Sequence, residues 1–160
     1  MLQNCAPRFS ASARSPLERG DLADDRKVDD YRLPVMAACR YALATLCGQP
    51  VHSAFGVSGD LATVIEVAGQ PGVRVWMQVE SRALAGLYEV AMGFEPDDHD
   101  VVDFLGELAN QTLGPAALNL PGVEPTRLSL PRSVSREEVP EGGDSVEVSG
   151  CSMRVVVGLF

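Results

Sequence analysis

Apolar and polar positions repeat with a helical period between residues 100 and 118. One side of this helix would carry mostly apolar residues, namely Val101, Phe104, Leu105, Leu108 and Thr112. The other side carries what we call the polar stripe, namely Asp103, Glu107, Asn110 and Gly114. At about 100° per residue, the stripe positions fall within roughly 60° of one another. The pattern predicts an amphipathic helix whose polar stripe faces solvent or a partner, and Pro115 predicts a bend near its end.

Two further helices are predicted. The first covers residues 33–47, with Asp29 and Asp30 as candidate N-caps, and ends at Gly48. Its side chains are apolar almost all round, so other elements must cover most of its surface. The second covers residues 81–92 and ends at Gly93, a residue typical of helix C-termini.

Short extended segments bounded by turn residues predict strands at residues 51–57, 61–68, 73–79, 126–130, 145–149 and 153–160. Their close spacing favours antiparallel hairpins over parallel crossovers. The order of elements is helix, three strands, helix, then helix and three strands, which divides the chain into two similar halves. The expected fold class is α+β: an antiparallel sheet with helices packed on it, built from two pseudo-symmetric helix-plus-strands halves.

The segment 73–79 alternates strictly, with apolar residues on one face. Arg74, Trp76 and Gln78 lie on the other face. Trp76 is either part of an exposed contact surface or partly covered by a neighbouring element.

The chain length of 160 residues suits a single domain. Residues 1–28 are rich in Ser, Arg, Ala and Asp and lack the apolar core of a secretory signal, so we expect a flexible N-terminal tail followed by a domain over residues 29–160. No run approaches the roughly 18 apolar residues that a membrane span needs.

The charge balance excludes some partners. There are 13 basic and 22 acidic residues, for a net charge of −9. A surface of this sign repels nucleic-acid phosphates and anionic membranes. The chain has four cysteines and two histidines: Cys5, Cys39, Cys47, Cys151, His52 and His99. The cysteines show no paired spacing and the histidines lie far apart in sequence, so no metal site is expected. Cys39 and Cys47 lie on a helix that is expected to be buried, where a free cysteine behaves as a small hydrophobic residue. Free cysteines indicate a reducing, cytoplasmic setting.

The polar stripe resembles the motif of the CheC/CheX/FliY family of bacterial chemotaxis phosphatases. The family pattern is Asp or Ser, three residues, Glu, two residues, Asn, and a Pro about twenty residues later. Here the matching residues are Asp103, Glu107, Asn110 and, after twenty intervening residues, Pro131. The resemblance covers about residues 30–160. Because the first predicted helix has no second Glu-x-x-Asn, the chain is most similar to the single-site, CheX-like members.

The resemblance implies an enzyme, a cytoplasmic homodimer that removes the aspartyl phosphate of a CheY-like response regulator. Glu107 and Asn110 would be catalytic, with Asn110 orienting the attacking water and Glu107 docking to the receiver's lysine. Asp103 and Gly114 would contact the partner. The protein would need no cofactor of its own, since the receiver supplies Mg²⁺. One alternative is a catalytically silent scaffold of the flagellar-switch type that binds phosphorylated receivers. The other is an adaptor whose stripe is only the solvent-exposed face of an amphipathic helix and never contacts a receiver.

Overall fold

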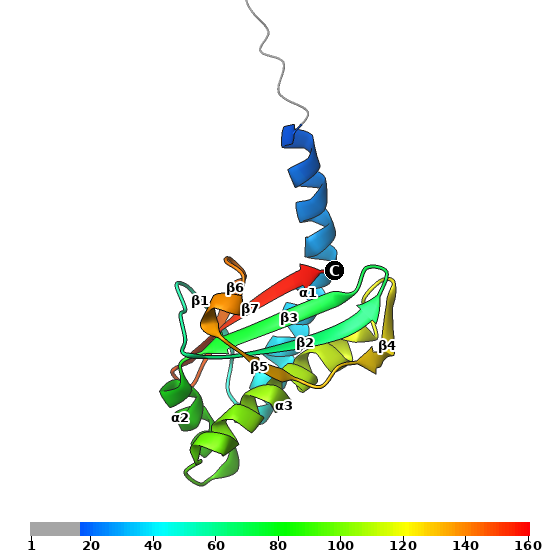
Figure 1. The fold of residues 1–160 in the computed structure, drawn as a ribbon. Coiled ribbons are helices and arrows are strands. Elements are labelled where there is room, and N and C mark those ends of the chain that lie inside the picture. The colour runs from blue at the N-terminus through cyan, green and yellow to red at the C-terminus, as the bar shows by residue number, and fades with distance from the viewer. Residues whose placement is uncertain (1–16) are drawn as a thin grey trace, which may run out of the picture.

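The computed structural model describes residues 17–160, with side chains described from residue 27 onward. In chain order the elements are α1 (Leu17–Cys47), β1 (His52–Ala54), β2 (Leu61–Gly69), β3 (Val73–Val79), α2 (Ser81–Met92), α3 (Asp98–Ala117), β4 (Val123–Leu128), β5 (Arg132–Val134), the short 3₁₀ helix η1 (Arg136–Glu138), β6 (Asp144–Val148) and β7 (Cys151–Leu159). α1 and α3 lie side by side on one face of a single sheet (Figure 1). The predicted α+β class is confirmed.

The strand order of the sheet reads β1-β6-β7-β3-β2-β4, with β5 also paired to β2, and every pairing is antiparallel. Reading the order backwards exchanges the two halves of the chain: β7 takes the place of β3, β6 that of β2, and β1 that of β4 and β5. The central contact is the β3–β7 pair, in which Trp76 lies opposite Val156. The two pseudo-symmetric halves expected from the element order are therefore present.

One expected hairpin is wrong. β2 and β3 form the hairpin expected from their sequences, but β1 pairs with β6, so that His52 lies opposite Glu147. The polar segment before β2 does not form a tight turn. Asp60 instead accepts hydrogen bonds from the backbone N–H (2.8 Å) and the hydroxyl (2.7 Å) of Ser81 at the start of α2.

The core lies between the sheet and the helices. Alternate residues of β3 are completely buried and point to the helical face: Val73, Val75, Met77 and Val79. All five residues on the predicted apolar side of α3 are buried as well: Val101, Phe104, Leu105, Leu108 and Thr112. Each fully buried aliphatic side chain contributes roughly 1.5–3 kcal/mol of hydrophobic stabilisation. This burial fixes the rotation of α3 and turns the polar stripe outward.

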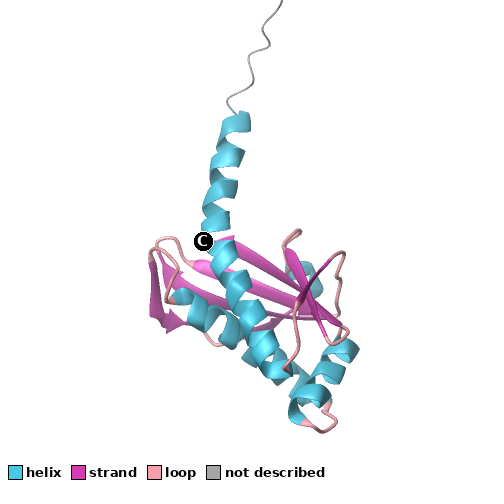
Figure 2. Cartoon of the chain, turned by 180° about the vertical axis from the view of Figure 1, so that it is seen from behind, coloured by secondary structure: helices cyan, strands magenta, loops and turns pink. Residues whose placement is uncertain are grey.

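α1 is longer than predicted. It begins at Leu17 and continues through Pro34, whereas the sequence predicts a start near residue 33. Asp29 is not the N-cap of this helix, because it lies inside it. Its side chain accepts a hydrogen bond from Arg32 Nε at 2.9 Å, one turn away within the same helix. Of the predicted N-terminal tail, residues 1–16 lie outside the described residues, and the division of the chain at residue 28 stays a prediction. α1 crosses the strands in the view from behind (Figure 2).

The opposite face of the sheet is partly covered by the chain that follows β5. Trp76 is half-buried there and packs against a small cluster that includes Val139 and Val156. Arg74 lies over its ring, 5.5 Å from the centroid. The partial covering of Trp76 is therefore the correct alternative. No helix in the described part of the chain is long and apolar enough to cross a membrane.

Candidate functional site

The start of α3 is fixed by a reciprocal capping pair. Asp97 Oδ1 accepts from the backbone N–H of Asp100 (2.8 Å), and Asp100 Oδ2 accepts from the backbone N–H of Asp97 (3.0 Å). Two otherwise unpaired helix donors are satisfied in this way, and the acidic first turn also suits the positive end of the helix dipole. The first residue of the stripe follows one turn later.

The polar stripe lies on the outer side of α3, as predicted. Asp103 and Glu107 are exposed, whereas Asn110 is half-buried. His99 Nδ1 lies 3.1 Å from Asp103 Oδ2, and Gln111 Nε2 donates to Glu107 Oε1 at 2.8 Å. The Asn110 side chain has no hydrogen-bond partner among the described residues. Its amide can therefore both donate and accept toward an incoming molecule.

Asn110 lines a shallow groove of about 360 Å³ between α3 and the chain entering β5. Leu130, Pro131 and Ser133 form one wall, and α3 forms the other. Thr63 of β2 holds the wall in place, because its hydroxyl donates to the carbonyl of Arg132 at 3.1 Å. The structure thus brings Pro131 next to the helix that carries Asp103, Glu107 and Asn110.

The groove has an apolar border, and an exposed cation lies in the neighbouring groove. Val102 is 39% exposed on one side and Leu130 is 86% exposed on the other. Val102 also lines a neighbouring groove between α2 and α3, to which Arg82 belongs. Arg82 is exposed and forms no ion pair or side-chain hydrogen bond with the described residues. An acidic stripe flanked by exposed apolar side chains and a free cation is suited to bind another protein.

Gly114 lies apart from the rest of the stripe. It is half-buried, and a Cβ added there would meet Leu128 of β4 at 3.8 Å. That is an ordinary van der Waals distance to this protein's own strand. α3 continues through Pro115 as far as Ala117.

Some residues of the groove were not predicted. Gly106 faces Pro131, and its signal in the sequence is a glycine in the middle of a helix, where alanine would be favoured by roughly 1 kcal/mol. Leu130 and Val102 are apolar residues exposed beside the stripe. In the sequence, only their positions next to Pro131 and Asp103 indicate that they belong to the groove. The Thr63 contact joins two distant segments and has no sequence signal.

The acidic residues near the groove do not form a metal-binding cluster. Within residues 27–160, no three His, Cys, Asp or Glu side chains gather in a way that could hold a metal ion. The Asp103 and Glu107 carboxylates are directed to His99 and Gln111 on the same helix.

Comparison with known proteins identifies the fold. No family model and no curated protein matches the chain. Among solved structures, CheX from Vibrio vulnificus matches with a TM-score of 0.64 and 15% identity over 81% of this chain and 99% of that one. A CheC-like superfamily protein from Shewanella sp. PV-4 matches with a TM-score of 0.63 and 17% identity, over 82% and 97% of the two chains.

A third match is to the CheX-CheY-BeF₃-Mg²⁺ complex from Borrelia burgdorferi, with a TM-score of 0.60 and 13% identity over 81% of this chain and 97% of that one. Identities this low establish the fold and leave the chemistry to be argued from the residues. The chain thus has the CheC/CheX/FliY fold, as the resemblance of its polar stripe and Pro131 to the family motif implies.

Proposed function

We propose that this protein hydrolyses the aspartyl phosphate of a CheY-like receiver domain. The observation that carries the proposal is the free amide of Asn110, one turn from the Glu107 carboxylate in a groove open to a partner. The fold supports it, since one of the solved structures with this fold is a CheX in complex with CheY.

The reaction requires few catalytic groups from the phosphatase. An aspartyl phosphate is an acyl phosphate, so a water molecule placed in line with the leaving carboxylate is sufficient for a large acceleration. The water oxygen bonds to phosphorus, the bond from phosphorus to the aspartyl oxygen breaks, and a proton of the water passes to the released phosphate. Asn110 would accept from and donate around that water without changing its own charge. It acts by positioning and needs no shifted pKa.

Glu107 would hold the receiver at the correct depth. Gln111 occupies Oε1 of this carboxylate, which leaves Oε2 for a lysine ammonium of the receiver. Asp103 would make a further contact at the N-terminal side of the stripe. The Mg²⁺ that neutralises the phosphoryl group would be held by the receiver's own acidic residues.

The border of the groove reduces the repulsion between two acidic proteins. This chain carries a net charge of −9, so the overall field opposes a phosphorylated acidic partner. Arg82, Val102 and Leu130 supply local attraction beside the stripe. The proposal also includes a homodimer and a cytoplasmic location, both of which the family resemblance implies. Sedimentation of the purified protein would test the dimer.

The decisive experiment measures phosphate loss from purified CheY-like receivers of the source organism after phosphorylation with acetyl phosphate. Adding this protein should accelerate the loss, and Asn110→Ala should abolish the acceleration. Asn119→Ala, an exposed asparagine beyond the end of α3, is the matched control and should behave like wild type. Tight binding of a phosphorylated receiver without acceleration would instead assign the catalytically silent scaffold.

A further inference from the structure

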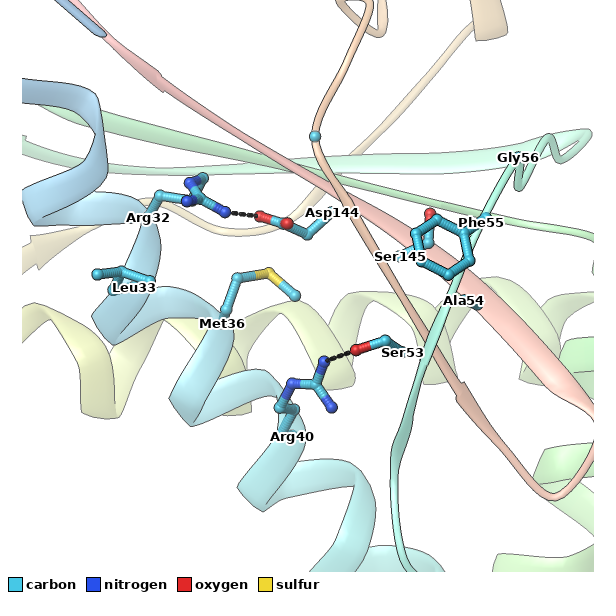
Figure 3. Close-up of a pocket in the computed structure, with 11 residues that line it drawn as sticks. Arg32, Leu33, Met36, Arg40, Ser53, Ala54, Phe55, Gly56, Asp144 and Ser145 are labelled. Carbon is cyan, nitrogen blue, oxygen red and sulfur yellow. Dashed lines mark hydrogen bonds and ion pairs between the residues drawn. The ribbon is translucent and has the colours of Figure 1, made fainter. Parts of the chain in front are cut away.

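A second groove lies over α1, at the place that the pseudo-symmetry pairs with the groove over α3. Its helical wall consists of Arg32, Leu33, Met36 and Arg40. These positions have the same spacing as the α3 residues that line the first groove, Val102, Asp103, Gly106 and Asn110. In both cases the opposite wall belongs to a short strand at the edge of the sheet, here β1 and the residues that follow it (Figure 3).

The chemistry of this second groove is the reverse of the first. Leu33 occupies the position of Asp103, Met36 that of Gly106, and Arg40 that of Asn110. An arginine has no acceptor atom with which to orient a nucleophilic water. The α1 groove therefore lacks the means for the hydrolysis proposed at α3, but it keeps a shaped cavity of about 380 Å³.

Arg40 is a cation held in place by neutral groups. Its guanidinium donates to the Ser53 hydroxyl at 2.8 Å and to the Val51 carbonyl at 3.3 Å. No carboxylate of the described residues lies within ion-pair distance of it. Arg32, by contrast, is paired with both Asp29 and Asp144. Figure 3 shows Arg40 directed from α1 toward β1. A half-buried guanidinium that is already positioned loses little entropy when it binds an anion.

The other walls offer apolar contact, backbone groups and the Asp144 carboxylate of β6, which Arg32 already pairs. Phe55 is 93% exposed at the end of β1, and Leu33 is 61% exposed across the groove. Among the described residues β1 is paired on one side only, to β6, so its outer edge presents backbone donors and acceptors that no described strand pairs. A peptide that adds to such an edge gains main-chain hydrogen bonds, while its alternate side chains enter the neighbouring groove.

We propose that the α1 groove binds an extended acidic segment of a partner protein, which pairs with the free edge of β1. One of its carboxylates meets Arg40, and an apolar side chain covers Phe55. A second copy of this chain that places its own β1 along this edge is a poorer occupant, because its segment His52 to Gly56 contains no carboxylate to offer Arg40. The proposal is independent of phosphatase activity.

The test uses a peptide of alternating Glu and Val, blocked at both ends, and the same peptide with Lys in place of Glu. In an NMR titration of the ¹⁵N-labelled full chain, the acidic peptide should shift the backbone amides of residues 52–56 in a saturable way. The Lys peptide should not. Absence of saturable shifts, or equal binding of the two peptides, would overturn the proposal.

Two variants test the assigned contacts. Arg40→Gln keeps a donor for Ser53 but removes the charge, and it should weaken the acidic peptide at least tenfold. Phe55→Ala changes only an exposed side chain and should weaken it less. Arg136→Gln, on η1 outside the groove, is the control and should change nothing. If Arg40→Gln binds the acidic peptide as tightly as wild type does, the acidic-segment assignment is wrong. Asn110→Ala should bind the peptide normally, so the two proposals fail separately.

Discussion

Pro131 packs directly against Gly106. A Cβ added at Gly106 would lie 3.4 Å from the Cβ of Pro131 and 3.7 Å from its Cγ. This contact sets how closely the wall formed by the β5 segment approaches α3, and therefore the width of the groove beside Asn110. It also gives a physical reason for a proline so far along the chain from the stripe: the rigid ring fills the space that the glycine leaves.

Two substitutions at Gly106 separate the effect of this contact on stability from its effect on activity. Gly106→Ala should stabilise the protein by up to about 1 kcal/mol, since alanine is the better helix former and 3.4 Å is only slightly tight. Gly106→Val should push Pro131 away and lower receiver dephosphorylation about tenfold. Urea unfolding and phosphate release measure the two effects.

Gly86→Ala provides the control for this pair. Gly86 is an exposed glycine within α2, and a Cβ there would meet nothing within 4 Å. It should give the same gain in stability with unchanged activity. Full activity in Gly106→Val would show that the groove width is not set by this contact.

Removing the charge of Glu107 should weaken receiver binding more than turnover. Glu107→Gln still accepts from Gln111, so the helix should keep its stability. Loss of one charge-assisted bond to the receiver's lysine should raise KM about tenfold. Steady-state kinetics against the phosphorylated receiver make the measurement, with the exposed Glu89→Gln on α2 as control. A fall in kcat at constant KM would assign Glu107 to the chemical step.

Arg82 should steer the acidic receiver to the groove. Arg82→Glu should slow association and raise KM, and the loss should shrink at high salt, because screening weakens an exposed charge. Stopped-flow association at several salt concentrations tests this. Arg136→Glu makes the same charge change away from the groove and should have a smaller effect. If the two variants slowed association equally, the effect of Arg82 would come only from its contribution to the net charge of the protein.

The link between Asp60 and Ser81 should make stability depend on pH. Hydrogen bonds from the Ser81 backbone and hydroxyl lower the pKa of Asp60. A carboxyl with a lowered pKa stabilises the folded state above its unfolded-state pKa, near 3.9, and this contribution is lost as the pH falls through the folded-state pKa. Asp60→Ala should cost about 1 kcal/mol at pH 7, as for a lost helix cap.

The difference in unfolding free energy between wild type and Asp60→Ala should narrow as the pH falls below about 4. Urea unfolding at a series of pH values measures it. Asp30→Ala, which removes an exposed carboxylate with no described hydrogen bond, should show no such narrowing. A constant difference for Asp60→Ala would mean that the Ser81 contact does not depend on the charge.

The cysteines should differ in reactivity. Burial raises the pKa of Cys39 to about 11 and that of Cys151 to about 12, and both thiols are enclosed in the core. Cys47 is half-buried, and burial raises its pKa as well. In a Cys5→Ser background, a thiol reagent at pH 8 should modify Cys47 first and reach the other two only at the rate of unfolding. Rapid modification of Cys39 in native protein would contradict the buried position.

The elements with strong local patterns were predictable from sequence. α3, β2, β3 and the β6–β7 hairpin show clear periodicity or a turn, and the outward position of Asp103, Glu107 and Asn110 follows from the apolar side of the helix. The partner of β1 was not predictable, because its pairing with β6 depends on residues far along the chain. The start of α1 was missed since Asp29 lies within the helix, and the contact between Gly106 and Pro131 crosses two elements. The roles of the four stripe residues stay predictions.

The exchange of edge strands between the two halves has a consequence for how the domain comes apart. β1 of the first half is hydrogen-bonded to β6 of the second, and β5 of the second to β2 of the first. A chain cut between α2 and α3 would leave two fragments, each without the strand that its own outer edge needs. Unfolding should therefore be a single cooperative event, and damage to either half should disable the grooves on both.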